Sequence, residues 1–249
     1  MNSPCDKLCH AVIMDYLMHS CYKETAKAFD SEYKKQSQFF ITTPWPNTDA
    51  MEIDIPIDEN GMLMNEQAWL ILDARKDIYE AIERGDIPTA FDLIQRRFPG
   101  LLQHISNRND VVNVDGLTEN EKIWADRVVF KLKCQQFIET VRSSNEVEAI
   151  RYAQQNLWPM NEYYQDMITE VAPLIVYTNP EQSSQAYLLS QDCRRQLADE
   201  VNDIILAYCK MPKQTAMEML QKQYQVVQQE LQSTKKMYNK FCIRDKRII

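Results

Sequence analysis

Glycine is scarce in this chain, and its scarcity limits the folds that the chain can adopt. Only four of the 249 residues are glycine, at positions 61, 85, 100 and 116, whereas an average usage of about 7% would give about seventeen. Folds that need glycine for tight turns, bulges or phosphate-binding loops are therefore disfavoured. Neither of the glycine-rich nucleotide-binding motifs, G-x-x-x-x-G-K-[ST] and G-x-G-x-x-G, occurs in the sequence.

Charge and hydropathy disfavour two further classes of protein. The 36 acidic and 28 basic residues give a net charge of −8, so the chain as a whole has no field that attracts nucleic acid. The longest apolar run, residues 171–177, contains Pro173 and is far shorter than the about 20 residues that span a bilayer. We therefore expect a folded protein that binds neither nucleic acid nor membrane.

The cysteines indicate a reducing compartment. Seven cysteines stand at positions 5, 9, 21, 134, 193, 209 and 242, with irregular spacing and no secretory signal before them. This pattern predicts reduced thiols and a location in cytoplasm and nucleus. A single zinc site built from Cys5, Cys9, His10, His19 and Cys21 is one interpretation, because Cys5 and Cys9 are one helical turn apart. We favour small residues on a short helix instead, and expect no metal and no other cofactor.

The N-terminal region predicts a helical hairpin that needs a partner. Between Leu8 and Phe29, apolar residues recur in i, i+4 steps on either side of His19-Ser20-Cys21. This spacing predicts two short helices joined by a tight turn. Chains below about 40 residues usually need a metal, a disulfide or a partner to bury such a face. We therefore expect the hairpin to dimerise.

Residues 37–66 separate this hairpin from the rest of the chain. They lose helical periodicity and are rich in Asp, Glu and Pro. We interpret them as an acidic flexible linker. The alternative is a docking segment for a partner, around Trp45 or residues 53–57.

Helical periodicity resumes at Trp69, and Gly85 and Asp86 predict a turn between two antiparallel helices. Gly85 can take the left-handed position after the first helix, Asp86 can cap the second, and Pro88 fits its first turn. The second helix is expected to stop at Pro99-Gly100, and the Asn- and Asp-rich residues from His104 to about 119 are expected to form a loop.

Further helices are predicted downstream. The helix over 124–141 is apolar on more than one side, which is typical of a central helix. Asn145 and Glu148 resemble a capping box that opens a helix ended by Trp158-Pro159. A turn is expected at 179–181, followed by a helix over 193–209 that ends before Pro212.

The last helix begins near Thr215 and carries apolar residues in steps of three and four as far as Phe241. We expect this stripe to face the chain's own core, and an intermolecular coiled coil is the alternative. A basic cluster follows, formed by Lys235, Lys236, Lys240, Arg244, Lys246 and Arg247. Complementing the helix dipole is the simpler role for these cations, and nuclear import or contact with an anionic partner is the alternative.

The residues resemble a known order of motifs. The stretch 13–29, with Tyr16-Leu17, Tyr22 and Thr25-Ala26, is similar to a LisH motif. Residues 75–102, with 82–86 and 98–102, resemble the CTLH core. Residues 130–139, 148–153, 176–180 and 200–206 resemble the entry into CRA and its later elements. The same order occurs in scaffold subunits of the GID/CTLH ubiquitin ligase complex and in the Ran-binding-protein-M group.

The resemblance implies an all-α fold in which a LisH hairpin precedes an antiparallel CTLH-CRA domain. It divides the chain into LisH (1–36), linker (37–66), CTLH (67–143), CRA (144–236) and a basic C-terminal tail (237–249). The implied LisH pairing face comprises Leu8, Val12, Ile13, Tyr16, Leu17, Tyr22, Thr25, Ala26 and Phe29. The implied CTLH-CRA assembly residues are Ile82, Gly85, Phe91, Phe98, Leu101, Leu102, Phe130, Leu132, Phe137, Ile138, Val201, Ile204 and Ile205.

The resemblance further implies that the chain is a non-catalytic scaffold in ubiquitin-dependent protein degradation. Such a scaffold would form a homodimer or a heterodimer through LisH. It would also bind other LisH-CTLH-CRA subunits, including those that carry a RING domain. The alternative is a free-standing LisH adaptor in a corepressor or a cytoskeletal assembly. The chain departs from the pattern in three respects. Cys21 stands where LisH turns usually carry glycine. A residue other than glycine in the left-handed conformation is strained by roughly 1 kcal/mol or more, so either the turn differs here or this LisH motif is weakened. The acidic linker and the 104–119 loop are longer than is typical of the family, and no SPRY domain precedes the LisH stretch.

Catalytic chemistry finds little support in the sequence. The region after His104 contains no histidine and only three cysteines besides Cys134, which is too few for a RING domain with about eight Cys and His ligands. Cys9 and His10 are adjacent, so they point to different sides of a helix. Cys134 is expected to be a buried small hydrophobe. A cysteine-dependent hydrolase therefore stays a minor alternative, and we expect no catalytic residues.

Overall fold

The computed structural model describes residues 4–39, 66–106, 117–143 and 145–245, and these residues contain helices and no strand. The expectation of an all-α fold is confirmed. The chain divides into two compact units: Met1–Leu63 with Gln214–Ile249, and Met64–Lys213. The interpretation of 37–66 as a linker falls almost wholly outside the described residues.

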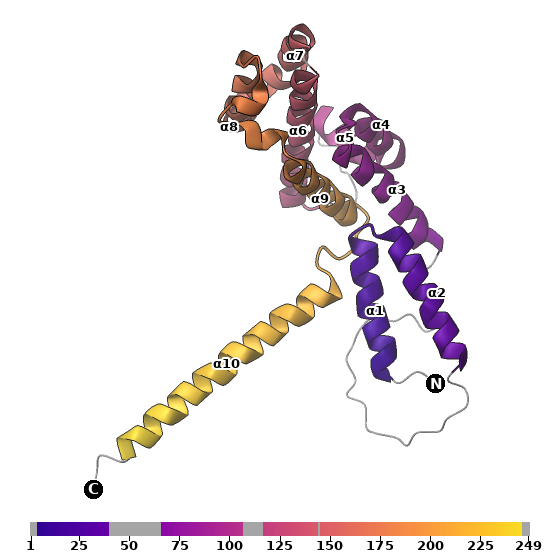
Figure 1. The fold of residues 1–249 in the computed structure, drawn as a ribbon, viewed down its shortest axis with the longest axis vertical. Coiled ribbons are helices and arrows are strands. Elements are labelled where there is room, and N and C mark those ends of the chain that lie inside the picture. Colours follow the sequence, from indigo (N-terminus) through magenta and orange to yellow (C-terminus); the bar gives the residue numbers. More distant parts are fainter. Residues whose placement is uncertain (1–3, 40–65, 107–116, 144, 246–249) are drawn as a thin grey trace. The chain divides into compact units, whose positions relative to one another are not determined.

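The first unit contains the predicted hairpin and the last helix. Helices α1 (Pro4–His19) and α2 (Lys23–Phe39) lie side by side and run antiparallel (Figure 1), and α10 (Ala216–Asp245) packs against α1. The turn between α1 and α2 places Cys21 at φ 61°, in the left-handed region that side chains other than glycine's rarely adopt. Of the two alternatives at Cys21, the turn keeps the left-handed conformation and carries the strain of a residue other than glycine.

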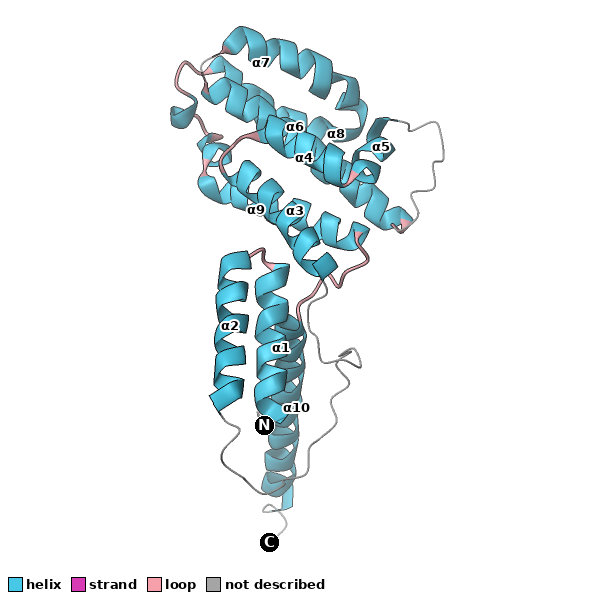
Figure 2. Cartoon of the chain, turned by 90° about the vertical axis from the view of Figure 1, so that its right-hand side faces the viewer, coloured by secondary structure: helices cyan, strands magenta, loops and turns pink. Residues whose placement is uncertain are grey.

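The second unit is a layered arrangement of helices around α6 (Figure 2). Helices α3 and α9 make the most extensive packing contact, and α6 packs against α9, α7 and α8. The longer helices are α3 (Glu66–Glu83), α4 (Ile87–Arg97), α5 (Pro99–Ser106), α6 (Glu119–Arg142), α7 (Glu146–Tyr152), α8 (Asn161–Val171) and α9 (Gln191–Tyr208). The short ones are a π-helical turn, η2 (Ala153–Leu157), and the 3₁₀ turns η3 (Trp158–Met160), η4 (Ala172–Val176), η5 (Pro180–Gln182) and η6 (Ala186–Leu189).

The turn between α3 and α4 has the predicted chemistry. Gly85 adopts φ 77°, and its N–H bonds to the carbonyl of Ile82, while the N–H of Asp86 bonds to the carbonyl of Ala81. The Asp86 carboxylate accepts from the Thr89 N–H at 3.3 Å, and Pro88 lies in the first turn of α4. These bonds satisfy the backbone groups that both helix ends leave open.

Helix α6 is the central helix that its apolar pattern predicts. One of its faces packs into a core formed with α3, α4, α5 and α9, where Leu132 and Ile205 are fully buried. Another face packs into a core formed with α7, α8 and the short turns around Leu174. Because one helix contributes to both cores, the predicted CTLH segment and residues 144–213 of the predicted CRA segment belong to one compact unit, whereas residues 214–236 belong to the first unit.

Helix α4 ends at Arg97, just before Pro99-Gly100, as predicted. Two other local predictions need correction. A further helix, α5, begins at Pro99, since proline fits a first turn, and runs to Ser106, beyond the loop start predicted at His104. Trp158-Pro159 does not end the helical path either. The chain passes through η2 and η3 directly into α8, because proline is tolerated at the start of the 3₁₀ turn.

Candidate interaction surfaces

The hairpin of the first unit exposes two aromatic side chains that belong to the predicted LisH face. Tyr16 is 38% and Tyr22 53% exposed, and their rings lie 6.3 Å apart, near the α1–α2 turn. Large exposed aromatics placed this close together are typical of protein interfaces. Thr25, one turn further along α2, is exposed as well.

The rest of the predicted LisH face lies deeper. Val12, Leu17 and Ala26 are buried within the first unit. Leu8, Ile13 and Phe29 are half-buried, and the Phe29 ring stacks on His10 with 5.1 Å between centroids. The structure thus divides the predicted face into an inner layer that holds the hairpin together and an outer part around Tyr16 and Tyr22.

Helix α10 carries a stripe of exposed apolar side chains, which we call the α10 stripe. It consists of Met217, Leu220, Tyr224, Val227 and Leu231, and each of them is 40–64% exposed. The interpretation that this stripe faces the chain's own core is therefore wrong for these residues. Contiguous apolar surface of this kind usually marks a place where another surface binds.

The start of α10 is fixed in the first unit by polar contacts. The Ala216 N–H donates to the Asp15 carboxylate of α1 at 2.7 Å, so a negative charge lies at the positive end of the helix dipole. Thr215 and Glu218 form a reciprocal capping box, with both bonds at 3.1 Å. The α10 stripe therefore begins beside α1 and continues away from this anchored end.

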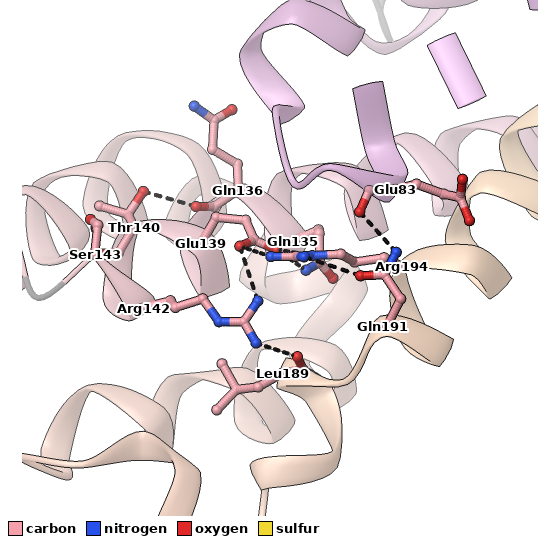
Figure 3. A network of polar contacts seen from close by, with 10 residues as sticks. All are labelled: Glu83, Gln135, Gln136, Glu139, Thr140, Arg142, Ser143, Leu189, Gln191 and Arg194. Atoms are coloured by element: carbon pink, nitrogen blue, oxygen red, sulfur yellow. Dashed lines mark hydrogen bonds and ion pairs between the residues drawn. The ribbon is translucent and has the colours of Figure 1, made fainter. Parts of the chain in front are cut away.

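In the second unit, a polar network joins the α3–α4 turn, α6 and α9 (Figure 3). The Glu139 carboxylate accepts from Arg194 Nε at 2.8 Å and from Arg194 Nη2 at 2.5 Å. Arg142 donates to the Leu189 carbonyl at 2.5 Å, and the Gln191 amide donates to the Glu83 carbonyl at 2.9 Å. The Arg194 side chain is 14% exposed and the Glu139 side chain 15%. Bidentate arginine–carboxylate pairs of this kind are stronger than ion pairs with a single hydrogen bond.

A second polar group links α3 to α9. The Arg75 side chain is 1% exposed, and its guanidinium donates to the Asn202 side-chain oxygen at 2.8 Å. The Tyr79 hydroxyl donates to Asp199 at 2.9 Å, one turn away on each helix. A guanidinium at this depth depends on such partners because an unpaired buried charge is costly.

The predicted CTLH-CRA assembly residues lie inside the second unit. Ile82, Phe98, Leu101, Leu132, Val201, Ile204 and Ile205 are buried in the core shared with α9, where Phe91 and Leu102 are partly buried. Phe130, Phe137 and Ile138 are buried in the core around α8. Gly85 lies beside the Arg194–Glu139 pair. These residues shape the unit, and none of them forms an exposed patch.

The exposed apolar side chains of the second unit were not singled out by the sequence. Val147 and Ile150 of α7, Trp158 of η3 and Tyr163 of α8 are 48–68% exposed. Periodicity marks such residues as apolar but does not separate solvent-facing from core-facing positions on short helices.

The thiols and histidines show no arrangement suited to catalysis or metal binding among the described residues. Burial, aided by Glu170 and Asp166, raises the pKa of the Cys134 thiol to about 12, so the thiol is protonated at neutral pH, unlike an activated nucleophile. Cys5 and Cys9 are exposed, whereas His10 is buried. In the parts of the chain that the structure covers, no three His, Cys, Asp or Glu side chains gather as metal ligands.

Some of these contacts carried a sequence signal and others did not. Thr118 and Glu121 form a complete capping box at the start of α6, and the S/T-x-x-E spacing would have located it. Glu139 and Arg194 are 55 positions apart, and Arg75 and Asn202 are 127 apart. No local pattern predicts such pairs, because only the packing of α3, α6 and α9 brings them together.

The sequence also matches a known protein family. The family model "CTLH/CRA C-terminal to LisH motif domain" matches residues 71–232, which is most of the chain. The chain belongs to this CTLH/CRA family. The match covers α3 from residue 71 on, the other helices of the second unit and the start of α10, including the α10 stripe.

Two relatives are informative. A Ran-binding protein M homolog from Arabidopsis thaliana is 27% identical over 200 residues, 80% of this chain and 36% of the relative. A glucose-induced degradation protein 8 homolog from Nematostella vectensis is 25% identical over 198 residues, 78% of this chain and 67% of the relative. The chain thus corresponds to only about a third of the plant relative. No solved structure matches it significantly.

Within the described segments, no helix combines the length and the apolar character that crossing a bilayer requires.

Proposed function

We propose that this CTLH/CRA protein is a non-catalytic scaffold subunit of a GID/CTLH-type ubiquitin ligase, acting in ubiquitin-dependent protein degradation. The membership of the family and the likeness to a glucose-induced degradation protein 8 homolog support this assignment. The observation that carries it is the α10 stripe, since apolar surface of this extent has a role only when a partner covers it.

In this proposal the first unit pairs with a second copy or with a related subunit. The pairing surface combines the outer part of the LisH face, at Tyr16 and Tyr22, with the α10 stripe. A helix of 30 residues extends about 45 Å, and isolated helices gain little stability in water without packing. Burial of Tyr16 and Tyr224, as aromatic anchors, contributes on the order of 2 kcal/mol each to association.

The second unit contacts other LisH-CTLH-CRA subunits, among them those that carry the RING domain. Its two cores keep α6 and α9 in fixed register, so that the exposed Val147, Ile150 and Trp158 form a preorganised surface. The predicted assembly residues act from inside, by holding this surface in shape. Preorganisation lowers the entropic cost of binding.

Affinity purification followed by mass spectrometry tests the assignment. Tagged wild-type protein is expected to recover RING-bearing CTLH proteins, and a variant with Tyr224→Ser and Leu231→Ser is expected to lose partners that bind the first unit. A control with Lys222→Ser and Gln229→Ser changes exposed residues on another side of α10 and should recover the same partners as wild type. Recovery of no RING-bearing protein by the wild type would contradict the ligase assignment.

The likeness to a Ran-binding protein M homolog supports a second candidate, a free-standing dimerisation adaptor in a corepressor or cytoskeletal assembly. The same purification distinguishes the two. The adaptor is favoured if cytoskeletal or corepressor proteins are recovered in place of RING-bearing ones.

We also propose that the protein works in cytoplasm and nucleus. The basic cluster at the C-terminal end is either a complement to the dipole of α10 or an import signal. Deleting residues 243–249 and imaging the tagged protein decides between them, since only an import signal predicts loss of nuclear protein.

A further inference from the structure

The second unit contains a cavity of about 240 Å³ between α6, α8, η6 and α9. Its inner part is lined by apolar side chains of α6, α8 and α9, among them Ile138, Met167, Val171 and Leu197, which are buried. Sites for drug-sized ligands measure about 300–1,000 Å³. This cavity is smaller, so its size suits one long side chain better than a cofactor.

The rim of the cavity is polar and carries three charged groups. The Lys131 ammonium lies 2.7 Å from each carboxylate oxygen of Glu200, so these two charges compensate each other. Glu170 accepts a hydrogen bond from the Tyr187 hydroxyl, which is a neutral donor. Within the described part of the chain, no lysine or arginine forms an ion pair with Glu170. The cavity therefore keeps one carboxylate without a cationic partner.

The negative charge also acts on the inner part of the cavity. Cys134 lines it, and after burial the Glu170 and Asp166 carboxylates are the main causes that raise the pKa of its thiol. An ion pair with Arg127 at 3.6 Å compensates Asp166. Among the charged groups described at this cavity, Glu170 is thus the carboxylate that is available to a positively charged group.

We propose that this cavity binds an arginine side chain from a partner protein. The aliphatic stem would lie against Met167 and Val171, as long basic side chains often bury their stems on apolar surface. The guanidinium would pair with Glu170 and pack beside the Tyr187 ring, because arginine forms bidentate carboxylate pairs and stacks on aromatic faces. Tyr187 is 52% exposed and Glu170 is exposed, so a peptide can reach both. The inference does not depend on the ligase assignment.

A titration followed by methyl NMR on the full-length protein tests the proposal. The probe is Nα-acetyl-arginine amide, and the matched neutral probe is Nα-acetyl-citrulline amide, which has almost the same shape without the charge. The arginine probe should shift the methyl signals of Ile138, Met167 and Val171, and the citrulline probe should bind at least about tenfold more weakly. Equal affinity for both probes, or no shift of these methyls, would overturn the proposal.

Three variants test the role of Glu170. Glu170→Gln should weaken binding of the arginine probe about tenfold, whereas Glu162→Gln, an exposed carboxylate of the same helix outside the cavity, should leave it unchanged. Tyr187→Phe removes the donor that competes for Glu170 and should tighten binding a few-fold. If Glu170→Gln and Glu162→Gln weaken binding equally, the effect is one of net charge and the proposal fails. Circular dichroism of each variant checks that the fold is intact.

Discussion

Replacing Gly85 by alanine tests whether the α3–α4 turn and the Arg194–Glu139 pair depend on each other. Gly85 adopts φ 77°, where an L side chain costs roughly 1 kcal/mol. A Cβ atom at this position would lie 2.7 Å from Arg194 Nη2, 2.9 Å from Arg194 Cζ and 3.0 Å from Glu139 Cδ. These contacts are too short, so the guanidinium has to shift, and its two hydrogen bonds to the Glu139 carboxylate should be weakened or lost.

The expected loss follows from these two effects. A hydrogen bond to a charged group contributes about 1.5–3 kcal/mol when it is protected from water, and the pair is mostly buried. Together with the strain at φ 77°, Gly85→Ala should reduce the free energy of unfolding by about 3 kcal/mol. For a unit of this size, that corresponds to a fall of about 6–12 °C in Tm.

Urea denaturation followed by tryptophan fluorescence measures this loss, since Trp69, Trp124 and Trp158 all belong to the second unit. Gly100→Ala is the matched control. There the nearest atom to the new Cβ is the Tyr208 hydroxyl oxygen at 2.7 Å, at the end of a side chain, and the backbone carries no positive φ, so the loss should be smaller. In an Arg194→Ala background, Gly85→Ala should cost only about 1 kcal/mol. Equal costs in both backgrounds would refute the link between turn and ion pair.

Three further predictions concern other contacts. Arg75→Ala should cost about 3 kcal/mol, because it removes the hydrogen bond from the guanidinium to Asn202 in a buried site, and an unchanged urea midpoint would contradict this. Cys21→Ala should leave the hairpin about 1 kcal/mol less stable than Cys21→Gly, since only glycine removes the strain at φ 61°, and thermal denaturation ranks the two. Burial lowers the pKa of His10, which faces Asp30 and Lys34 and stacks on Phe29 and Tyr33. The unfolded state therefore binds the proton more readily, so stability of the first unit should fall as pH drops below about 6.5, and His10→Leu should flatten the pH dependence of Tm.

The sequence predicted the elements that depend on local chemistry. Gly85, Asp86 and Pro88 determine a turn whose bonds lie within a few residues, and Asn145 caps α7 by accepting from the Glu148 N–H. In each case the residue type and its neighbours are enough to specify the backbone.

Features that depend on long-range packing could not be predicted in this way. The apolar residues of the α10 stripe have the same three- and four-residue spacing as the core-facing residues of α9. The α9 residues are buried, whereas the α10 residues are exposed, because no helix of the described chain covers them. The cavity beside Glu170 combines α6, α8, η6 and α9, which the sequence separates widely. Periodicity shows that a face is apolar, but not what covers it.

The molar mass of the purified protein in solution, measured by multi-angle light scattering, tests the central claim most directly. If the α10 stripe and Tyr16 form a pairing surface, the wild type should show about twice the 29.3 kDa of one chain or a larger assembly. Tyr224→Ser with Leu231→Ser should then give the mass of a single chain with unchanged helical content, and Lys222→Ser with Gln229→Ser should behave as wild type. A wild type that stays at the mass of one chain at high concentration, and binds no related subunit, would contradict the account.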